Sequence, residues 1–209
     1  MGERADYDPA VARTLLVLTS LVLLATSGCQ VGPDERPLPS TVDPVRIVGA
    51  LPTPPELRDE RAASAVDART AAGLLGSGEG SGAGRTLTDN GFLRGATRSW
   101  VTPGGGTMEV VVSVWRNRQT ASGIGGKAAE RVLSLPGARA WSPGDLRGAR
   151  GAEAPTATPP RRALSRAVVQ NGLYVVSTGD VPAATVVRAM KRLSLLVEGS
   201  GGTSGASVR

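Results

Sequence analysis

The strongest constraint on the fold is one stretch, Thr107–Trp115 (TMEVVVSVW). From Met108 onward an apolar residue stands at every second position, so one face of an extended strand would be apolar. Ala96–Thr102 (ATRSWVT) also alternates, and the turn-forming residues 103–106 (PGGG) lie between the two stretches. This order predicts a β-hairpin.

A second hairpin is predicted towards the C-terminus. Ala163–Gln170 and Leu173–Thr178 are strand-like in composition. The Asn171-Gly172 pair between them is the strongest short hairpin-turn signal in the chain, because both residue types tolerate positive φ. We therefore expect the turn at these two residues.

A helix is expected after each hairpin, and one more before them. Arg118–Leu135 follows the first hairpin, and Ala183–Val197, with an apolar stripe at helical spacing, follows the second. Residues 56–75 begin with acidic residues after two prolines, as a helix N-terminus does. The sequence thus predicts an α+β domain over 56–198. Its fold would be a four-stranded antiparallel sheet from two hairpins, each followed by a helix, with an additional N-terminal helix.

The N-terminus has the pattern of an export signal. Residues 14–28 carry no charge, but a membrane-spanning helix needs about 20 apolar residues. The stretch is instead typical of the apolar region of a signal peptide over residues 1–28. Arg13 precedes this stretch and acidic residues crowd the first positions, so we expect translation to start at Val11 rather than Met1.

The apolar run ends in ATSGC, and its last residue is Cys29, the single cysteine of the chain. This pattern resembles the lipobox of bacterial lipoproteins. The resemblance implies cleavage before Cys29, a diacylglycerol on its sulfur, palmitate as an attached acyl chain, and a protein held on the extracytoplasmic face of the cell membrane. A plain secretory signal with an incidental cysteine, or an uncleaved anchor, are the alternatives.

The regions on either side of the predicted domain have simple compositions. Residues 29–55 are rich in proline and predict an extended tether. Residues 199–209 consist mostly of glycine and serine, which bury little surface, so we expect a disordered tail.

The composition also excludes much chemistry. The chain has no histidine, which removes imidazole bases and most zinc and haem sites, and a lone cysteine allows no disulfide scaffold. We therefore expect no cofactor, no metal and no catalytic residue. Paired carboxylates can catalyse hydrolysis without histidine, but nothing in the sequence brings two of them together. The acidic candidates in the domain are Glu109, Glu130, Asp145, Glu153 and Asp180.

The formal net charge is +6. Arg161, Arg162 and Arg166, at the end of a loop predicted over 142–162, are a local concentration of charge and predict contacts with an anionic partner. A solubilising surface is the alternative. An exported protein with scattered arginines is not expected to bind nucleic acid. Trp115 is either a partner-contact anchor or a core residue.

The whole layout resembles small actinobacterial cell-envelope lipoproteins of unassigned function. Because the sequence has no nucleophile–base pair and no metal constellation but has a lipid anchor and a tether, we expect a non-catalytic interaction or accessory module, whose partner is an envelope protein or an anionic polymer. The alternative is a carrier or sensor that holds a small molecule or lipid between sheet and helices. An apolar cavity of a few hundred Å³ would favour the carrier, and a packed core with an exposed patch the interaction module.

Overall fold

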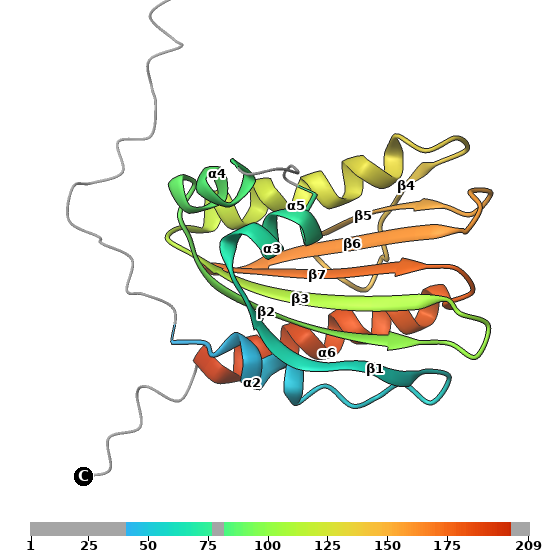
Figure 1. Cartoon of the computed structure of the whole chain (residues 1–209), viewed down its shortest axis with the longest axis horizontal. Coiled ribbons are helices and arrows are strands. Elements are labelled where there is room, and N and C mark those ends of the chain that lie inside the picture. Colours follow the sequence, from blue (N-terminus) through green and yellow to red (C-terminus); the bar gives the residue numbers. More distant parts are fainter. Residues whose placement is uncertain (1–40, 77–81, 202–209) are drawn as a thin grey trace, which may run out of the picture. The chain divides into compact units, whose positions relative to one another are not determined.

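The computed structural model describes residues 41–76 and 82–201 (Figure 1). Their central feature is a seven-stranded sheet in which every neighbouring pair of strands is antiparallel. The strand order is β1-β2-β3-β7-β6-β5-β4. The strands are β1 (Arg58–Val66), β2 (Phe92–Val101), β3 (Thr107–Trp115), β4 (Arg139–Trp141), β5 (Ala149–Ala154), β6 (Arg161–Val168) and β7 (Asn171–Thr178).

The four-stranded sheet predicted from the sequence is wrong. The two predicted hairpins exist as β2–β3 and β6–β7, and they join through the β3–β7 pair. Three further strands extend the sheet. β1 lies inside the stretch expected to be the first helix, and β5 lies in the expected loop 142–162. The local sequence of both is rich in alanine and charge, and pairing with a neighbouring strand overrides that weak preference.

Helices cover both faces of the sheet (Figure 1). α2 (Pro44–Gly49) and α6 (Ala183–Gly201) pack on one face, and α5 (Arg118–Leu133) packs on the other, beside α3 (Ala68–Leu74) and α4 (Ala83–Asp89). The core therefore has two parts. Met108 and Val112 belong to the part under α2 and α6, while Val111 and Trp115 belong to the part under α5.

Part of β3 and part of β7 share a core with the last helix. Val112 lies opposite Leu173 in the sheet. Both are fully buried in one cluster with Met190 and Leu193 of α6. Trp115 is a core residue, packed edge-on against Phe92 with a distance of 5.4 Å between ring centroids.

Helix α2 lies within 29–55, the range in which the prolines predict an extended tether. Asp43 caps the helix by accepting a hydrogen bond from the Val45 backbone N–H, and Pro44 occupies the first turn, where its missing N–H costs nothing. Ile47 and Val48 are buried in the core. From residue 41 onward this range is folded against the sheet rather than extended.

The turn of the second hairpin is displaced from its expected place. Val168 pairs with Asn171 and Ala167 with Gly172, so the turn residues are Val169 and Gln170. Asn171 and Gly172 belong to β7. Gly172 is needed there for space, because a Cβ atom would lie 2.7 Å from Ser113 Oγ and 2.5 Å from the Tyr174 hydroxyl oxygen.

Val169 has a φ of 52° and is 66% exposed. A β-branched residue is strained in this left-handed region, and two-residue hairpins commonly place glycine there. Val169→Gly should therefore stabilise the fold by about 1 kcal/mol, measured as a rise in the thermal midpoint. Val169→Ala is the control, because it removes the exposed apolar group but keeps a Cβ atom. Equal midpoints for the two variants would show that exposure, not strain, governs this position.

Candidate functional site

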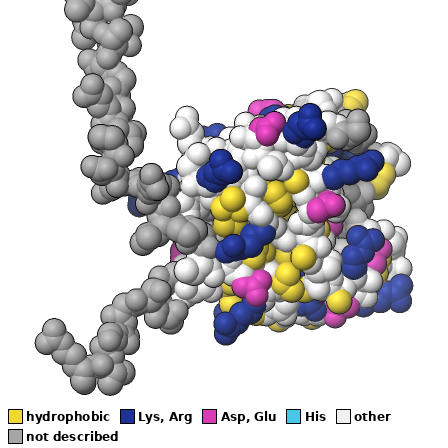
Figure 2. Space-filling model, turned by 60° about the vertical axis from the view of Figure 1, so that its left-hand side comes forward, with side chains coloured by type: hydrophobic (Ala, Val, Ile, Leu, Met, Phe, Trp, Pro, Cys, Tyr) yellow, Lys and Arg dark blue, Asp and Glu magenta, His cyan; other side chains and the backbone are white. Residues whose placement is uncertain are grey.

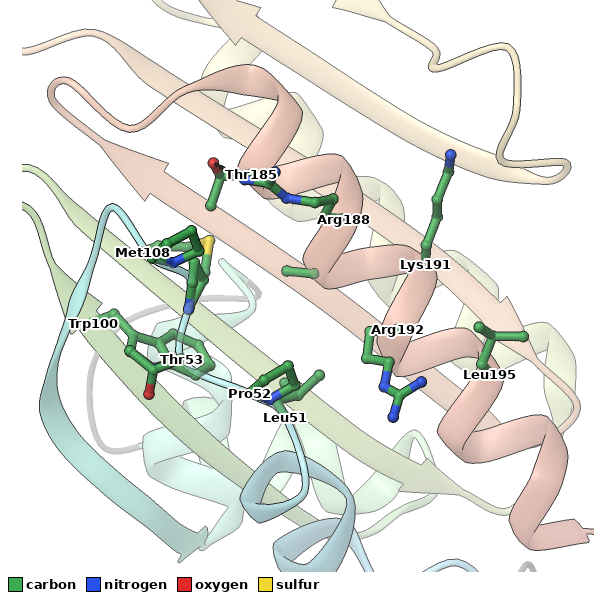
Figure 3. Close-up of a pocket in the computed structure, with 13 residues that line it drawn as sticks. Leu51, Pro52, Thr53, Trp100, Met108, Thr185, Arg188, Lys191, Arg192 and Leu195 are labelled. Carbon is green, nitrogen blue, oxygen red and sulfur yellow. Dashed lines mark hydrogen bonds between the residues drawn. The ribbon is translucent and has the colours of Figure 1, made fainter.

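One cavity lined by described residues lies between α6, β2, β3 and the segment that follows α2 (Figure 3). Its volume is about 540 Å³. We call residues 51–56 the strap, because this segment crosses from α2 towards the sheet edge along the open side of the cavity. The lining residues are Leu51, Pro52, Thr53, Pro54, Pro55, Trp100, Met108, Thr185, Arg188, Ala189, Lys191, Arg192 and Leu195.

The floor of the cavity is a pair of large side chains from neighbouring strands. Trp100 of β2 stands opposite Met108 of β3, and both are buried. Cross-strand neighbours share a face of the sheet, so the pair presents an aromatic ring and a thioether to the same space. The floor is therefore apolar and well suited to alkyl or aromatic groups.

Arg98 and Trp100 hold the first part of the strap. The Arg98 guanidinium donates to the Leu51 carbonyl oxygen at 2.6 Å and pairs with Asp59 at 2.7 Å. The hydrogen bonds from Arg98 lower the pKa of Asp59. Arg98 also lies 4.9 Å from the centroid of the Trp100 ring, whose Nε1 donates to Thr53 Oγ1 at 3.3 Å.

The far end of the strap is joined to α6. Glu56 accepts hydrogen bonds from the Thr185 hydroxyl and from Arg188, the latter at 2.6 Å. The hydrogen bond from Thr185 and the charge of Arg188 lower the pKa of Glu56. The strap is thus held at both ends, to β2 and to α6, and its prolines lie between these two points.

The cavity combines an apolar interior with a basic rim. Arg188, Lys191 and Arg192 of α6 form this rim, and none of the described residues that line the cavity is acidic. Leu195, one turn beyond Lys191, is 60% exposed. Such a site can hold an apolar body and favours negative charge at its edge. The sequence offered a cavity between sheet and helices only as the alternative and without its residues, although the basic residues beside the apolar stripe of 183–197 were a visible signal.

The three arginines predicted to contact an anionic partner do not form one cluster. Arg161 lies on the α5 side of the sheet, where it is exposed. Arg162 and Arg166 lie on the α6 side. Arg162 donates to the Val181 carbonyl oxygen at 2.8 Å, and Arg166 pairs with Glu198 at 3.1 Å. Their role in binding an anionic partner stays a prediction.

The surface in Figure 2 shows basic and acidic side chains interspersed with apolar ones. The positive net charge is therefore not gathered into a single basic block on that face. This distribution favours a local charge contact over binding to a broad anionic surface.

The carboxylates considered for catalysis have separate surroundings. Asp145 pairs with Lys191, and Glu153 pairs with Arg139 and Arg162, whose hydrogen bonds lower the pKa of Glu153. Asp180 accepts a hydrogen bond from Thr102, and Glu130 is exposed on α5. Glu109 is half-buried and accepts a hydrogen bond from the Thr97 hydroxyl at 2.8 Å. Burial raises the pKa of Glu109.

Cys29, the predicted signal peptide 1–28 and the tail from residue 202 lie outside the described residues. Within residues 41–76 and 82–201, no helix has the length and apolar character needed to cross a membrane. The same residues contain no group of His, Cys, Asp or Glu arranged to hold a metal ion.

Comparison with known proteins gives a weak structural likeness. No protein-family model matches the chain, and no curated protein matches it in sequence. Among solved structures, the chain is similar to the extracellular domain of PknH from Mycobacterium tuberculosis, with a TM-score of 0.45 and 7% sequence identity. The match covers 74% of this chain and 90% of that one.

The raised pKa of Glu109 predicts a pH effect on stability. The folded state holds the proton on Glu109 more tightly than the unfolded state does, so the contribution of Glu109 to stability falls as the pH rises above about 4.5, the ordinary value. Glutamine can keep the contact with Thr97 and carries no charge. The thermal midpoint of Glu109→Gln should therefore rise relative to wild type between pH 4 and pH 7.

Glu130→Gln is the control, because it removes the same charge from an exposed position on α5. A difference between Glu109→Gln and wild type that stayed constant from pH 4 to pH 7 would contradict this account of Glu109.

Proposed function

We propose that this protein is a non-catalytic binding module that is lipid-anchored outside the cytoplasm and holds an apolar small molecule in the cavity beneath α6. The observation that carries the proposal is the cavity of about 540 Å³ over Trp100 and Met108. Small-molecule sites typically measure about 300–1,000 Å³ and have mostly apolar linings with a few polar groups at set places. Between the two functions considered from the sequence, this favours the carrier or sensor.

The construction of the site supports the same proposal. Its floor belongs to the central strands of the sheet, and its wall is the longest helix. A site on such rigid elements keeps its shape without a ligand. The strap adds a third wall that is fixed mainly by polar contacts at its two ends.

The extracytoplasmic location rests on the N-terminal sequence. An apolar run that ends at the lone Cys29 supports lipidation and export, and two or three acyl chains hold a protein durably at a membrane, whereas one chain binds marginally. An apolar ligand and a membrane anchor agree with each other, since molecules of this kind partition into membranes.

Cys29→Ala should remove the acyl chains and shift the protein from the membrane fraction to the medium or to an uncleaved precursor. Fractionation of cells and the mass of the mature N-terminal peptide measure this outcome. Ser27→Ala, which keeps a small residue beside the cleavage position, is the control. The lipoprotein proposal is wrong if the Cys29→Ala protein is processed and partitions as the wild type does.

Ala189→Trp should fill the cavity. Ala189 lines the cavity from α6 and is only partly buried, so a larger side chain can enter the space without displacing the core. We expect at least a tenfold loss of affinity for N-phenyl-1-naphthylamine, a neutral apolar dye. The measurement is a fluorescence titration of residues 29–209 with Cys29→Ala, which avoids detergent.

The matched control is Ala184→Trp, because Ala184 is exposed on the same helix and does not line the cavity. Unchanged dye binding by a folded Ala189→Trp protein would place the apolar site elsewhere. If wild-type protein bound no dye and yielded no extractable ligand when purified from its host, the binding function would be refuted.

A further inference from the structure

The three basic residues on the rim of the cavity differ in their partners. Arg188 is paired with Glu56 at 2.6 Å and contacts Thr185, and Lys191 is paired with Asp145. Arg192 is exposed and has no hydrogen bond or ion pair with any of the residues the structure describes. Its charge is therefore the one on this rim that is not already matched within the described domain.

The direction of Arg192 relates this charge to the cavity. In Figure 3 the Arg192 and Lys191 side chains leave α6 in opposite directions, with Arg192 on the side of Leu51 and the strap. Arg192 and Leu195 are also neighbours on the helix surface, three residues apart. The guanidinium thus stands at the edge of the apolar space, next to an exposed leucine.

The size of the cavity limits the apolar part of the ligand. A group the size of one water molecule occupies about 30 Å³. A volume of about 540 Å³ therefore accommodates on the order of 18 such groups. This is enough for one alkyl chain with a headgroup.

From these observations, and resting on the proposed function, we infer that the ligand is a single-chain amphiphile with an acidic headgroup. Its alkyl chain lies over Trp100 and Met108, and its carboxylate or phosphate pairs with Arg192 at the rim. The planar guanidinium matches both groups, since each offers two oxygens for parallel N–H···O hydrogen bonds. The carboxylates nearest this rim, Glu56 and Asp145, are already paired with Arg188 and Lys191, which leaves Arg192 for the negative charge of the ligand.

The test compares probes that share one chain length and differ in the headgroup: decanoate, decyl phosphate, decanol and decyltrimethylammonium. Each displaces N-phenyl-1-naphthylamine from residues 29–209 with Cys29→Ala, at concentrations below micelle formation. We expect both anions to bind at least tenfold more tightly than the cation. This preference should shrink at high salt, because the Arg192 contact is near solvent.

Arg192→Gln should lower the affinity for decanoate and decyl phosphate about tenfold and leave decanol unchanged. Arg192→Lys keeps the positive charge but lacks the planar guanidinium. Its affinity for the two anions should therefore lie between those of Arg192→Gln and the wild type. Arg118→Gln is the control, because it removes the same side chain from an exposed position on α5, on the other face of the sheet.

Two results would overturn the inference about the headgroup. The first is that all four probes bind equally. The second concerns Arg192→Gln: the variant binds the anions as tightly as wild type does, or its affinity for decanol falls together with its affinity for the anions. In each case the proposed function stands as long as the dye binds and Ala189→Trp blocks it. If neither the dye nor any probe binds wild-type protein, the proposed function itself fails.

Discussion

Strand β3 is paired on both sides, with β2 and with β7, and it is buried on both faces. Val110 and Val112 face α2 and α6, while Val111 and Trp115 face α5. A strand in this position requires a helical layer on each face, because either layer alone would leave half of its side chains in water. The rest of the architecture follows from this. β2 and β7 extend the sheet outward, and the cavity forms where α6 and the strap meet over β2 and β3.

The sequence predicts the centre of this sheet well and its edges poorly. Both hairpins can be predicted from local signals. For the first hairpin, these are the alternating apolar residues of β3 and the turn residues after β2. β1 and β5 have few large apolar residues. Their pairing depends on a neighbouring strand, which a local pattern does not contain. Even in β3, the consecutive valines 110–112 indicate burial on both faces. The prediction of a single apolar face did not use this signal. The displaced hairpin turn has a similar cause. Glycine is required at position 172 because Ser113 and Tyr174 fill the space that a Cβ atom would take, and the local sequence does not show these contacts.

The candidate site was hidden for a different reason. Proline lacks a backbone N–H and cannot join the interior of a helix or sheet, so Pro52, Pro54 and Pro55 suggest a tether. The same property suits a strap, whose shape depends on side chains from elsewhere. Arg98 supplies the donor for the Leu51 carbonyl oxygen, and Glu56 reaches α6. These contacts join residues that are distant in sequence. Only the helix wall of the cavity, with Arg188, Arg192 and Leu195 beside the apolar stripe, was present in the sequence as a periodic pattern.

Val42 is already buried in the core, and this bears on how an anchor at Cys29 would act. An extended chain spans at most about 3.6 Å per residue, so residues 30–40 can separate the lipidated cysteine from the domain by no more than roughly 40 Å. The expected tether up to residue 55 would have allowed more than twice that distance. With Cys29 lipidated as proposed, this connection keeps the domain at the membrane rather than free in the surrounding water. A single-chain amphiphile enters water reluctantly because its alkyl chain is apolar, and a binding site in a domain held at the membrane shortens the path that the chain travels through water.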